Sequence, residues 1–138
     1  MNSNSLAKEE ELFVNAFVYP SKRSRTLGLL KSKKRRTKFL SQLFHYPDFD
    51  PRFLQQIDPS AQFVESILNI LLSKGAGLDC YVISASSDLD QTKGILVEIL
   101  GTVIGYHPGT IISCIPGKLA YYEAEMNNER YILERSKG

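Results

Sequence analysis

The residues best suited to chemistry in this sequence form a dense basic run near the N-terminus. Nine of the seventeen residues from Lys22 to Lys38 are Lys or Arg, and no Asp or Glu occurs between Leu12 and Pro47. Cationic side chains at this density can neutralise phosphates and release the counterions that surround a nucleic acid. The residues expected to contact phosphates lie in the densest part of the run: Lys33, Lys34, Arg35, Arg36 and Lys38.

Charge is divided unevenly along the chain. Residues 1–47 hold ten Lys or Arg and three Glu, a net charge of +7, whereas residues 48–138 hold seven Lys or Arg and twelve Asp or Glu, a net charge of −5. This division predicts a basic helical arm at 1–47 and an α+β domain at 48–138, packed together as one compact unit. Either the arm binds an acidic partner, or the acidic part of the same chain neutralises it.

The kind of acidic partner is also open. Phe39, Phe44, His45 and Tyr46 follow the basic run and could stack on the bases of a single strand. An acidic protein or an anionic membrane surface would attract the same cations. No apolar stretch approaches the roughly 20 residues that a membrane span needs. The N-terminus also lacks the apolar core of a secretory signal, so a cytoplasmic location is expected.

Three other segments could support an enzyme. The 84–90 loop follows a predicted strand and opens a predicted helix, where backbone amides can hold a phosphate, although helix capping explains its Ser and Asp residues as well. Asp88 and Asp90 could contribute to a divalent metal site, but they need further ligands. His107 and Cys114 could act as base and nucleophile if the fold brings them together. No cofactor motif is present, so the sequence predicts no bound cofactor.

Helices are expected to carry the basic run and the segment that follows it. A first helix reaches the Tyr19-Pro20 pair, and an amphipathic helical segment with a break at Gly28 follows. The Asp50-Pro51 pair is expected to begin a short helix through Ile57, and Asp58-Pro59 a longer one that ends near Gly75.

The later part of the chain is expected to form a mixed four-stranded sheet with helices on one face. Strands are predicted at 79–84 and 110–115, made parallel by a crossover helix through about Val103, and Cys80 and Cys114 are expected to be buried free thiols. An antiparallel meander follows, in which an Asn127-Asn128 turn places Glu125 opposite Arg130. One face of this hairpin is expected to be core, namely Ala120, Tyr122, Ala124, Tyr131 and Leu133, and the other to face solvent, namely Tyr121, Glu123, Glu125, Arg130 and Glu134.

The leading interpretation is a non-enzymatic binding or regulatory protein whose basic arm contacts nucleic-acid phosphates. The first alternative is an interaction module that docks a protein partner or a second copy of the chain through the open sheet or the arm. The second alternative is a small enzyme with a site near the 84–90 loop and His107. The positions of the basic side chains in the fold distinguish these interpretations most directly.

Overall fold

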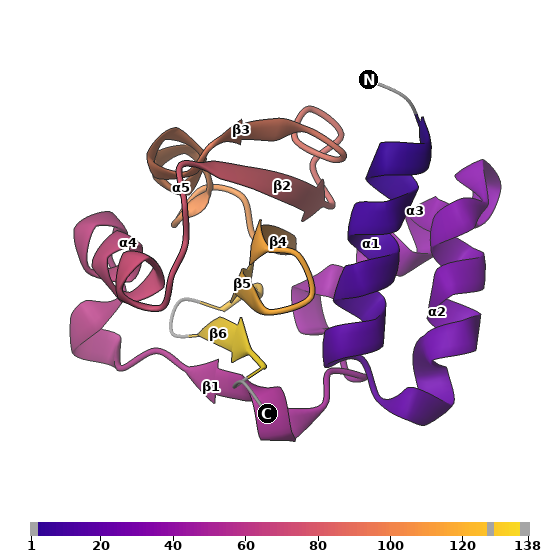
Figure 1. The fold of residues 1–138 in the computed structure, drawn as a ribbon, viewed down its shortest axis with the longest axis horizontal. Helices are drawn as coiled ribbons and strands as arrows, with labels where there is room; N and C mark the ends of the chain where they lie inside the picture. Colours follow the sequence, from indigo (N-terminus) through magenta and orange to yellow (C-terminus); the bar gives the residue numbers. More distant parts are fainter. Residues whose placement is uncertain (1–2, 127–128, 136–138) are drawn as a thin grey trace.

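A computed structural model describes residues 3–126 and 129–135 as an α+β fold with three layers. Three helices come first: α1 (Ser3–Phe17), α2 (Pro20–Lys31) and α3 (Lys33–Gln42). They cover one face of a central sheet, and α4 (Val64–Ser73) and α5 (Leu96–Val103) cover the other (Figure 1). No helix among the described residues is long and apolar enough to cross a membrane.

The sheet is antiparallel throughout and has six strands in the order β1-β6-β5-β4-β2-β3. These strands are β1 (Leu54–Gln56), β2 (Asp79–Ser84), β3 (Lys93–Ile95), β4 (Thr110–Ile115), β5 (Leu119–Glu123) and β6 (Arg130–Glu134). Short 3₁₀ turns lie at Leu43–His45, Pro51–Phe53 and Pro59–Ala61. The predicted α+β class is confirmed, whereas the predicted four strands become six.

The parallel crossover expected between β2 and β4 is wrong. The chain turns back after β2 at Gln91, which has a φ of 63°, and returns as β3 against β2 before α5 begins. The helix expected from about residue 86 therefore starts only at Leu96. Because β3 reverses the chain before the helix, β4 pairs antiparallel with β2.

Helices also differ in detail from the expectations. The segment after Asp50 forms only one 3₁₀ turn and then the edge strand β1. The helix expected from Asp58 is divided, because Phe63 is extended and α4 begins after it. Gly75, with a φ of 107°, ends this region as expected. The break between α2 and α3 lies at Ser32 rather than Gly28.

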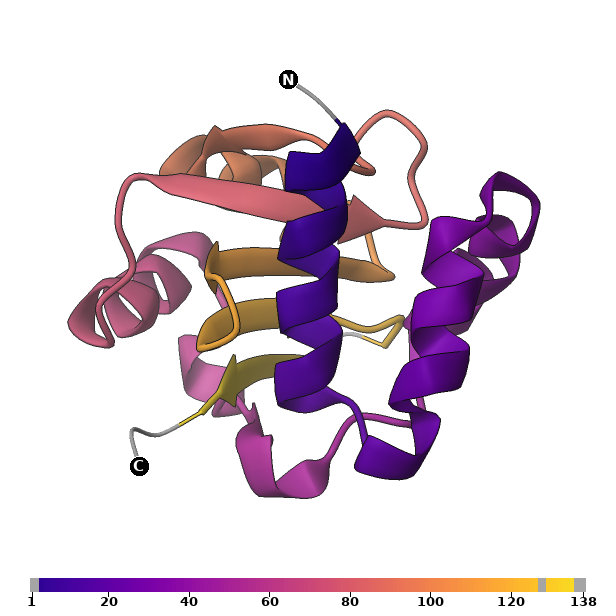
Figure 2. The ribbon, with the colours of Figure 1, turned by 45° about the vertical axis from the view of Figure 1, so that its right-hand side comes forward.

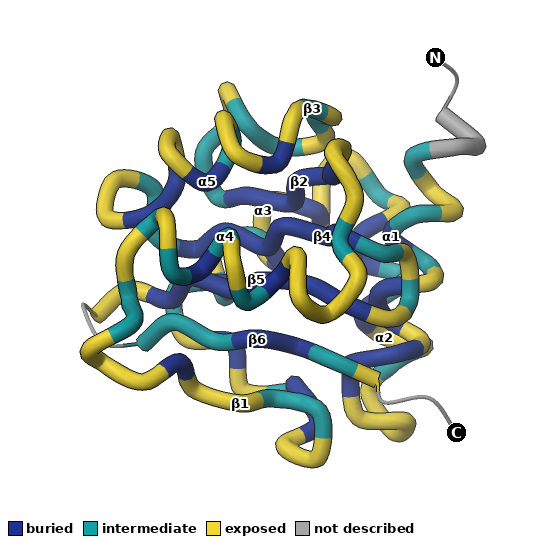
Figure 3. The backbone as a smooth tube through the Cα atoms, turned by 60° about the vertical axis from the view of Figure 1, so that its left-hand side comes forward, coloured by how far each residue is buried: buried dark blue, intermediate teal, exposed yellow. Residues whose placement is uncertain are grey.

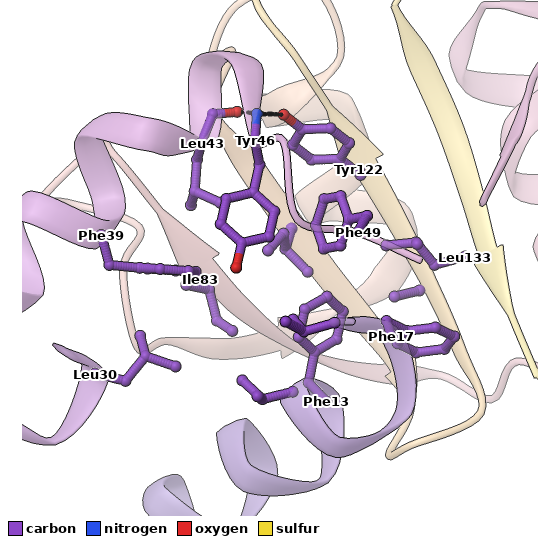
Figure 4. Packing of buried hydrophobic residues seen from close by; sticks show 14 of the residues in the cluster. Phe13, Phe17, Leu30, Phe39, Leu43, Tyr46, Phe49, Ile83, Tyr122 and Leu133 are labelled. Carbon is purple, nitrogen blue, oxygen red and sulfur yellow. Dashed lines mark hydrogen bonds between the residues drawn. The ribbon is translucent and has the colours of Figure 1, made fainter. Parts of the chain in front are cut away.

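The hydrophobic interior consists of two clusters, one on each face of the sheet. The first combines helical residues such as Phe13, Phe17 and Phe39 with Ile83 and Tyr122 from the strands (Figure 4). Tyr122 donates to the Leu43 carbonyl at 2.6 Å and accepts from the Tyr46 amide at 3.1 Å. Residues from both 1–47 and 48–138 therefore share one core, and Figure 2 shows α1 crossing the strands directly.

The second cluster buries the face of the β5–β6 hairpin that was expected to lie in solvent. Tyr121 and Glu123, expected in solvent, are 0% and 3% exposed because α4 and α5 cover that face. Glu123 is satisfied there by Tyr121 Oη at 2.7 Å and Arg130 Nε at 3.3 Å. Figure 3 shows the central strands buried and β1 largely exposed at the edge.

For the β5–β6 hairpin, the side chains predicted to face the core do so, but the predicted pairing of residues across the two strands is wrong. Tyr122, Ala124 and Leu133 are buried as predicted, and Tyr131 packs partly buried against the same cluster. Arg130 lies opposite Glu123 rather than Glu125. A shift by two residues keeps every side chain on its predicted face, because side chains alternate with a period of two. The Asn127-Asn128 turn lies outside the described residues.

Cys80 and Cys114 are free and buried, as predicted, and their thiols should react slowly in the folded protein. Burial is the main cause that raises the pKa of each thiol to about 12, and only the thiolate is nucleophilic. We expect alkylation by iodoacetamide near neutral pH to be roughly a thousandfold slower in the folded chain than in urea. Mass spectrometry of quenched samples measures both rates, and equal rates would contradict this burial.

Candidate polyanion-binding surface

Two consecutive helices present the basic run as a hairpin at one end of the helical layer. Pro20 occupies the first turn of α2, where its missing amide costs nothing. Ser32 separates the two helices and caps α3, because its Oγ accepts from the Arg35 amide at 3.2 Å. The apolar sides of the two helices pack into the core through Leu29, Leu30 and Phe39, and their polar sides therefore face solvent.

Seven basic side chains of the hairpin are exposed: Lys22, Arg25, Lys31, Lys33, Lys34, Arg35 and Lys38. None of the seven forms an ion pair with a carboxylate of the described residues, and Arg35 donates only to the Gly28 carbonyl at 3.3 Å. The described acidic residues therefore do not neutralise these charges by direct pairing. The first turn of α3 also contains no acid, so Lys33, Lys34 and Arg35 oppose the positive end of the helix dipole.

Arg36 differs from its neighbours, and the structure does not fit its predicted role as a phosphate contact. Its residue exposure is only 8%, and two carboxylates already occupy its guanidinium. Nη1 and Nη2 donate to the two Glu10 oxygens at 2.7 Å each, whereas Nε and Nη2 donate to Asp90 at 2.8 and 3.0 Å. Each pair is bidentate, the strongest geometry available to arginine. Arg36 thus links α3 to α1 and to the loop between β2 and β3, which carries Asp90.

Further hydrogen bonds complete this ionic cluster. Tyr81 Oη donates to Glu10 Oε2 at 2.5 Å, and the Ser84 amide donates to Asp90 Oδ1 at 2.9 Å. Burial raises the pKa of Tyr81, and its bond to Glu10 raises it further, so the phenol remains a donor. Burial alone would lower the pKa of Arg36, but its two carboxylate partners outweigh burial and raise it. The guanidinium therefore stays charged.

The sequence contained a signal for this cluster that composition alone does not show. Glu10 lies on the same helical stripe as Phe13 and Phe17, and Arg36 lies on the same stripe as Phe39 and Leu43. A charged residue on an apolar stripe enters the interior and needs a buried partner. The hydrophobic period thus indicated that Glu10 and Arg36 would be buried. It could not indicate that Asp90 would complete the ionic cluster.

Two of the aromatic residues expected to stack on bases are core residues instead. Phe39 and Tyr46 are 1% and 8% exposed and pack edge to face with ring centroids 5.4 Å apart. His45 is exposed, but its Nε2 lies 2.6 Å from Glu125 Oε1. Phe44 is partly buried, and its ring lies close to Gly109. The hairpin therefore presents cations without an aromatic platform.

The residues of the enzymatic alternative do not converge. Cys114 lies near the far end of β4 from His107, and four residues of strand place it about 13 Å beyond Thr110. Asp90 is held by Arg36, whereas Asp88 is exposed at the surface. Within residues 3–126 and 129–135, no three His, Cys, Asp or Glu side chains gather as a metal site.

Comparisons with protein-family models, with curated proteins and with solved structures found no match for this chain.

Two adjacent arginines provide a test of the division between buried and exposed charges. Arg36→Gln leaves Glu10 and Asp90 buried without a cation, and breaking a buried ion pair in this way costs about 3–5 kcal/mol. Arg35→Gln removes an exposed charge and should change the free energy of unfolding by less than about 0.5 kcal/mol. Urea denaturation followed by circular dichroism measures both changes. Equal losses from the two variants would show that Arg36 has no special structural role.

Proposed function

We propose that this protein is a non-enzymatic binding or regulatory protein that contacts nucleic acid through phosphate groups. The observation that carries the proposal is the set of seven exposed, carboxylate-free cations on the α2–α3 hairpin. Four of them, Lys33, Lys34, Arg35 and Lys38, lie on α3 and belong to the residues predicted from sequence. Arg36 is excluded from the proposed contacts because its guanidinium is buried and doubly paired.

The charge density of α3 is suited to a duplex. Ten helical residues span about 15 Å at 1.5 Å per residue. Duplex DNA carries one negative charge per about 1.7 Å, so about nine charges lie along that length. The exposed cations of this helix, Lys33, Lys34, Arg35 and Lys38, are the groups proposed to contact those phosphates. A surface of this kind binds with little sequence preference, because phosphate contacts position a protein but do not read bases.

The absence of an exposed aromatic platform favours a duplex over a single strand. Single-strand binding proteins gain roughly 1–3 kcal/mol per base from stacking on aromatic rings. Phe39 and Tyr46 are occupied in the core, and Phe44 is partly buried. Tyr19, just before α2, is therefore the one exposed Phe or Tyr ring among the described residues next to the hairpin. Phosphate neutralisation remains as the main source of affinity.

Docking of a protein partner or of a second copy at the sheet edge stays a prediction. The two edge strands, β1 and β3, are only three residues long, and short edges limit strand pairing between chains. An acidic protein would bind the same cations as a nucleic acid. Competition between an acidic polypeptide and labelled duplex for the chain shows which of the two is bound more tightly.

Binding to duplex DNA should weaken steeply with salt if the α3 cations contact phosphates. Four contacts predict a slope of about −3.6 in log K against log salt, since each neutralised phosphate contributes about −0.9. Replacing Lys33, Lys34 and Arg35 together with Gln should remove about 2.7 of that slope without unfolding the chain. Fluorescence anisotropy with random-sequence duplex and single strand, at several salt concentrations, measures these slopes.

A matched control carries the same change in net charge at distant sites. Lys8, Lys74 and Lys118 are exposed and lie outside the hairpin, so replacing all three with Gln should leave the slope nearly unchanged. If wild type fails to bind any nucleic acid at low salt, the proposal is wrong. If the control and the hairpin variant lose affinity equally, general charge rather than this surface is responsible.

A further inference from the structure

Apolar side chains are exposed around β3, the edge strand that lies beyond β2 (Figure 1). Leu78 precedes β2, Ile95 ends β3, and Val97 lies in the first turn of α5; they are 80%, 45% and 48% exposed. The Leu96 amide donates to the Leu78 carbonyl at 2.7 Å, which holds these segments together. An exposed apolar patch beside an open strand edge is typical of a surface that pairs with another chain.

The backbone of β3 offers hydrogen-bonding groups along this edge. The Val82 amide donates to the Thr92 carbonyl at 2.9 Å, so Thr92 faces β2. In an antiparallel ladder every second residue directs its N–H and C=O groups at the neighbouring strand, and Gly94 therefore also faces β2. The residues on either side of Gly94, Lys93 and Ile95, direct their amides away from β2 and toward the open edge.

This pattern suits a second copy of the same edge. The outward-facing residues lie one position to each side of Gly94, so β3 presents a symmetric edge about that residue. When two copies are related by a two-fold axis at Gly94, Lys93 of each copy lies opposite Ile95 of the other. The Ile95 amide of each copy can then donate to the Lys93 carbonyl of the other. Such a contact is isologous and closed, because each copy uses the same edge once.

Charged side chains beside β3 are also complementary in this arrangement. Asp79, Ile95 and Lys93 project from one face of the sheet, because Asp79 pairs with Ile95 and side chains alternate along β3. The two-fold pairing places Lys93 of one copy two strand spacings, about 10 Å between backbones, from Asp79 of the other. A lysine and an aspartate side chain together span that distance. Asp79 is exposed and belongs to no ion pair among the described residues, whereas Glu9 lies 3.9 Å from Lys93 and offsets repulsion between the two lysines.

The opposite edge of the sheet is less suited to pairing. β1 exposes Gln55 and Gln56 rather than apolar side chains. The exposed Arg52 lies in the 3₁₀ turn directly before it. Polar and charged side chains along an edge strand oppose pairing with another chain. The apolar patch, the outward-facing amides and the complementary charges all occur together at β3.

We propose that two copies of this chain associate through β3 in an antiparallel, two-fold pairing that covers Leu78, Ile95 and Val97. The paired strands are three residues long, so the contact is small and the dimer is weak and reversible. This interface uses none of the seven exposed cations of the hairpin. It is therefore independent of the proposed contact with nucleic acid.

The oligomeric state of the full chain tests this pairing. Sedimentation velocity from about 10 μM to about 1 mM should show the mean mass rising from that of a monomer toward that of a dimer. Ile95→Pro removes the outward amide and should weaken association at least about tenfold. The fold should tolerate this change, because Ile95 has a φ of −84°, close to the angle that proline adopts, and follows a glycine. The control Ile95→Val keeps the amide and should retain the dimer.

A charge variant and a wild-type measurement complete the test. Asp79→Asn should weaken association about two- to fivefold, whereas Glu65→Gln, at the start of α4, should not change it. Amide hydrogen exchange of the wild type should show Ile95 protected at high concentration and unprotected at low concentration, which tests the pairing even if Ile95→Pro unfolds. A chain that stays monomeric at about 1 mM overturns the proposal and leaves a strand of a different protein as the occupant. A dimer that Ile95→Pro leaves unchanged, or an Ile95 amide whose exchange is independent of concentration, overturns the β3 interface.

Discussion

Arg36 is the residue through which the helical layer is joined to the loop beside the sheet. Its guanidinium holds Glu10 of α1 and Asp90 of the loop between β2 and β3, segments that lie far apart in the sequence. Removing three such charges from water is costly, and only two bidentate pairs with further donors from Tyr81 and Ser84 offset that cost. The cluster demands one geometry: a shift of α3 or α1 would leave a charge buried without its partner.

Neighbouring residues on one helix serve different purposes because a helix turns by about 100° at each residue. Arg35 faces solvent and Arg36 faces the interior, so one basic run supplies both a surface and a buried anchor. The same holds for α1, where Glu9 lies 3.9 Å from Lys93 of β3 and Glu10 belongs to the ionic cluster. The buried residue of each adjacent pair, Arg36 or Glu10, fixes the helix and so also the position of its neighbour. The exposed cations of α3 are therefore held in place without pairing with a carboxylate of the described residues.

Much of the fold follows from local patterns, and the failures have physical causes. Turn chemistry and hydrophobic period correctly predicted strands near 79–84 and 110–115 and a core role for Tyr122 and Leu133. The edge strands β1 and β3 were missed because three residues carry too little alternation to recognise. The burial of Tyr121 and Glu123 was missed because it depends on α4 and α5 covering the second face, which is a long-range property. Of the predicted contacts, Arg36 was misplaced because charge was counted without regard to the helical stripe on which it lies.

The central claim is that Arg36 is a buried anchor while the cations around it remain free to contact a polyanion. Heteronuclear NMR of the arginine side chains tests both halves in one titration with a short DNA duplex. The Nε–Hε signal of Arg36 should exchange slowly with water and keep its chemical shift at every duplex concentration. The signal of Arg35 and the amides around Lys33 and Lys34 should shift progressively and return when salt is added. A fast-exchanging Arg36 signal that moves with duplex, or an Arg35 signal that does not move, would contradict the account.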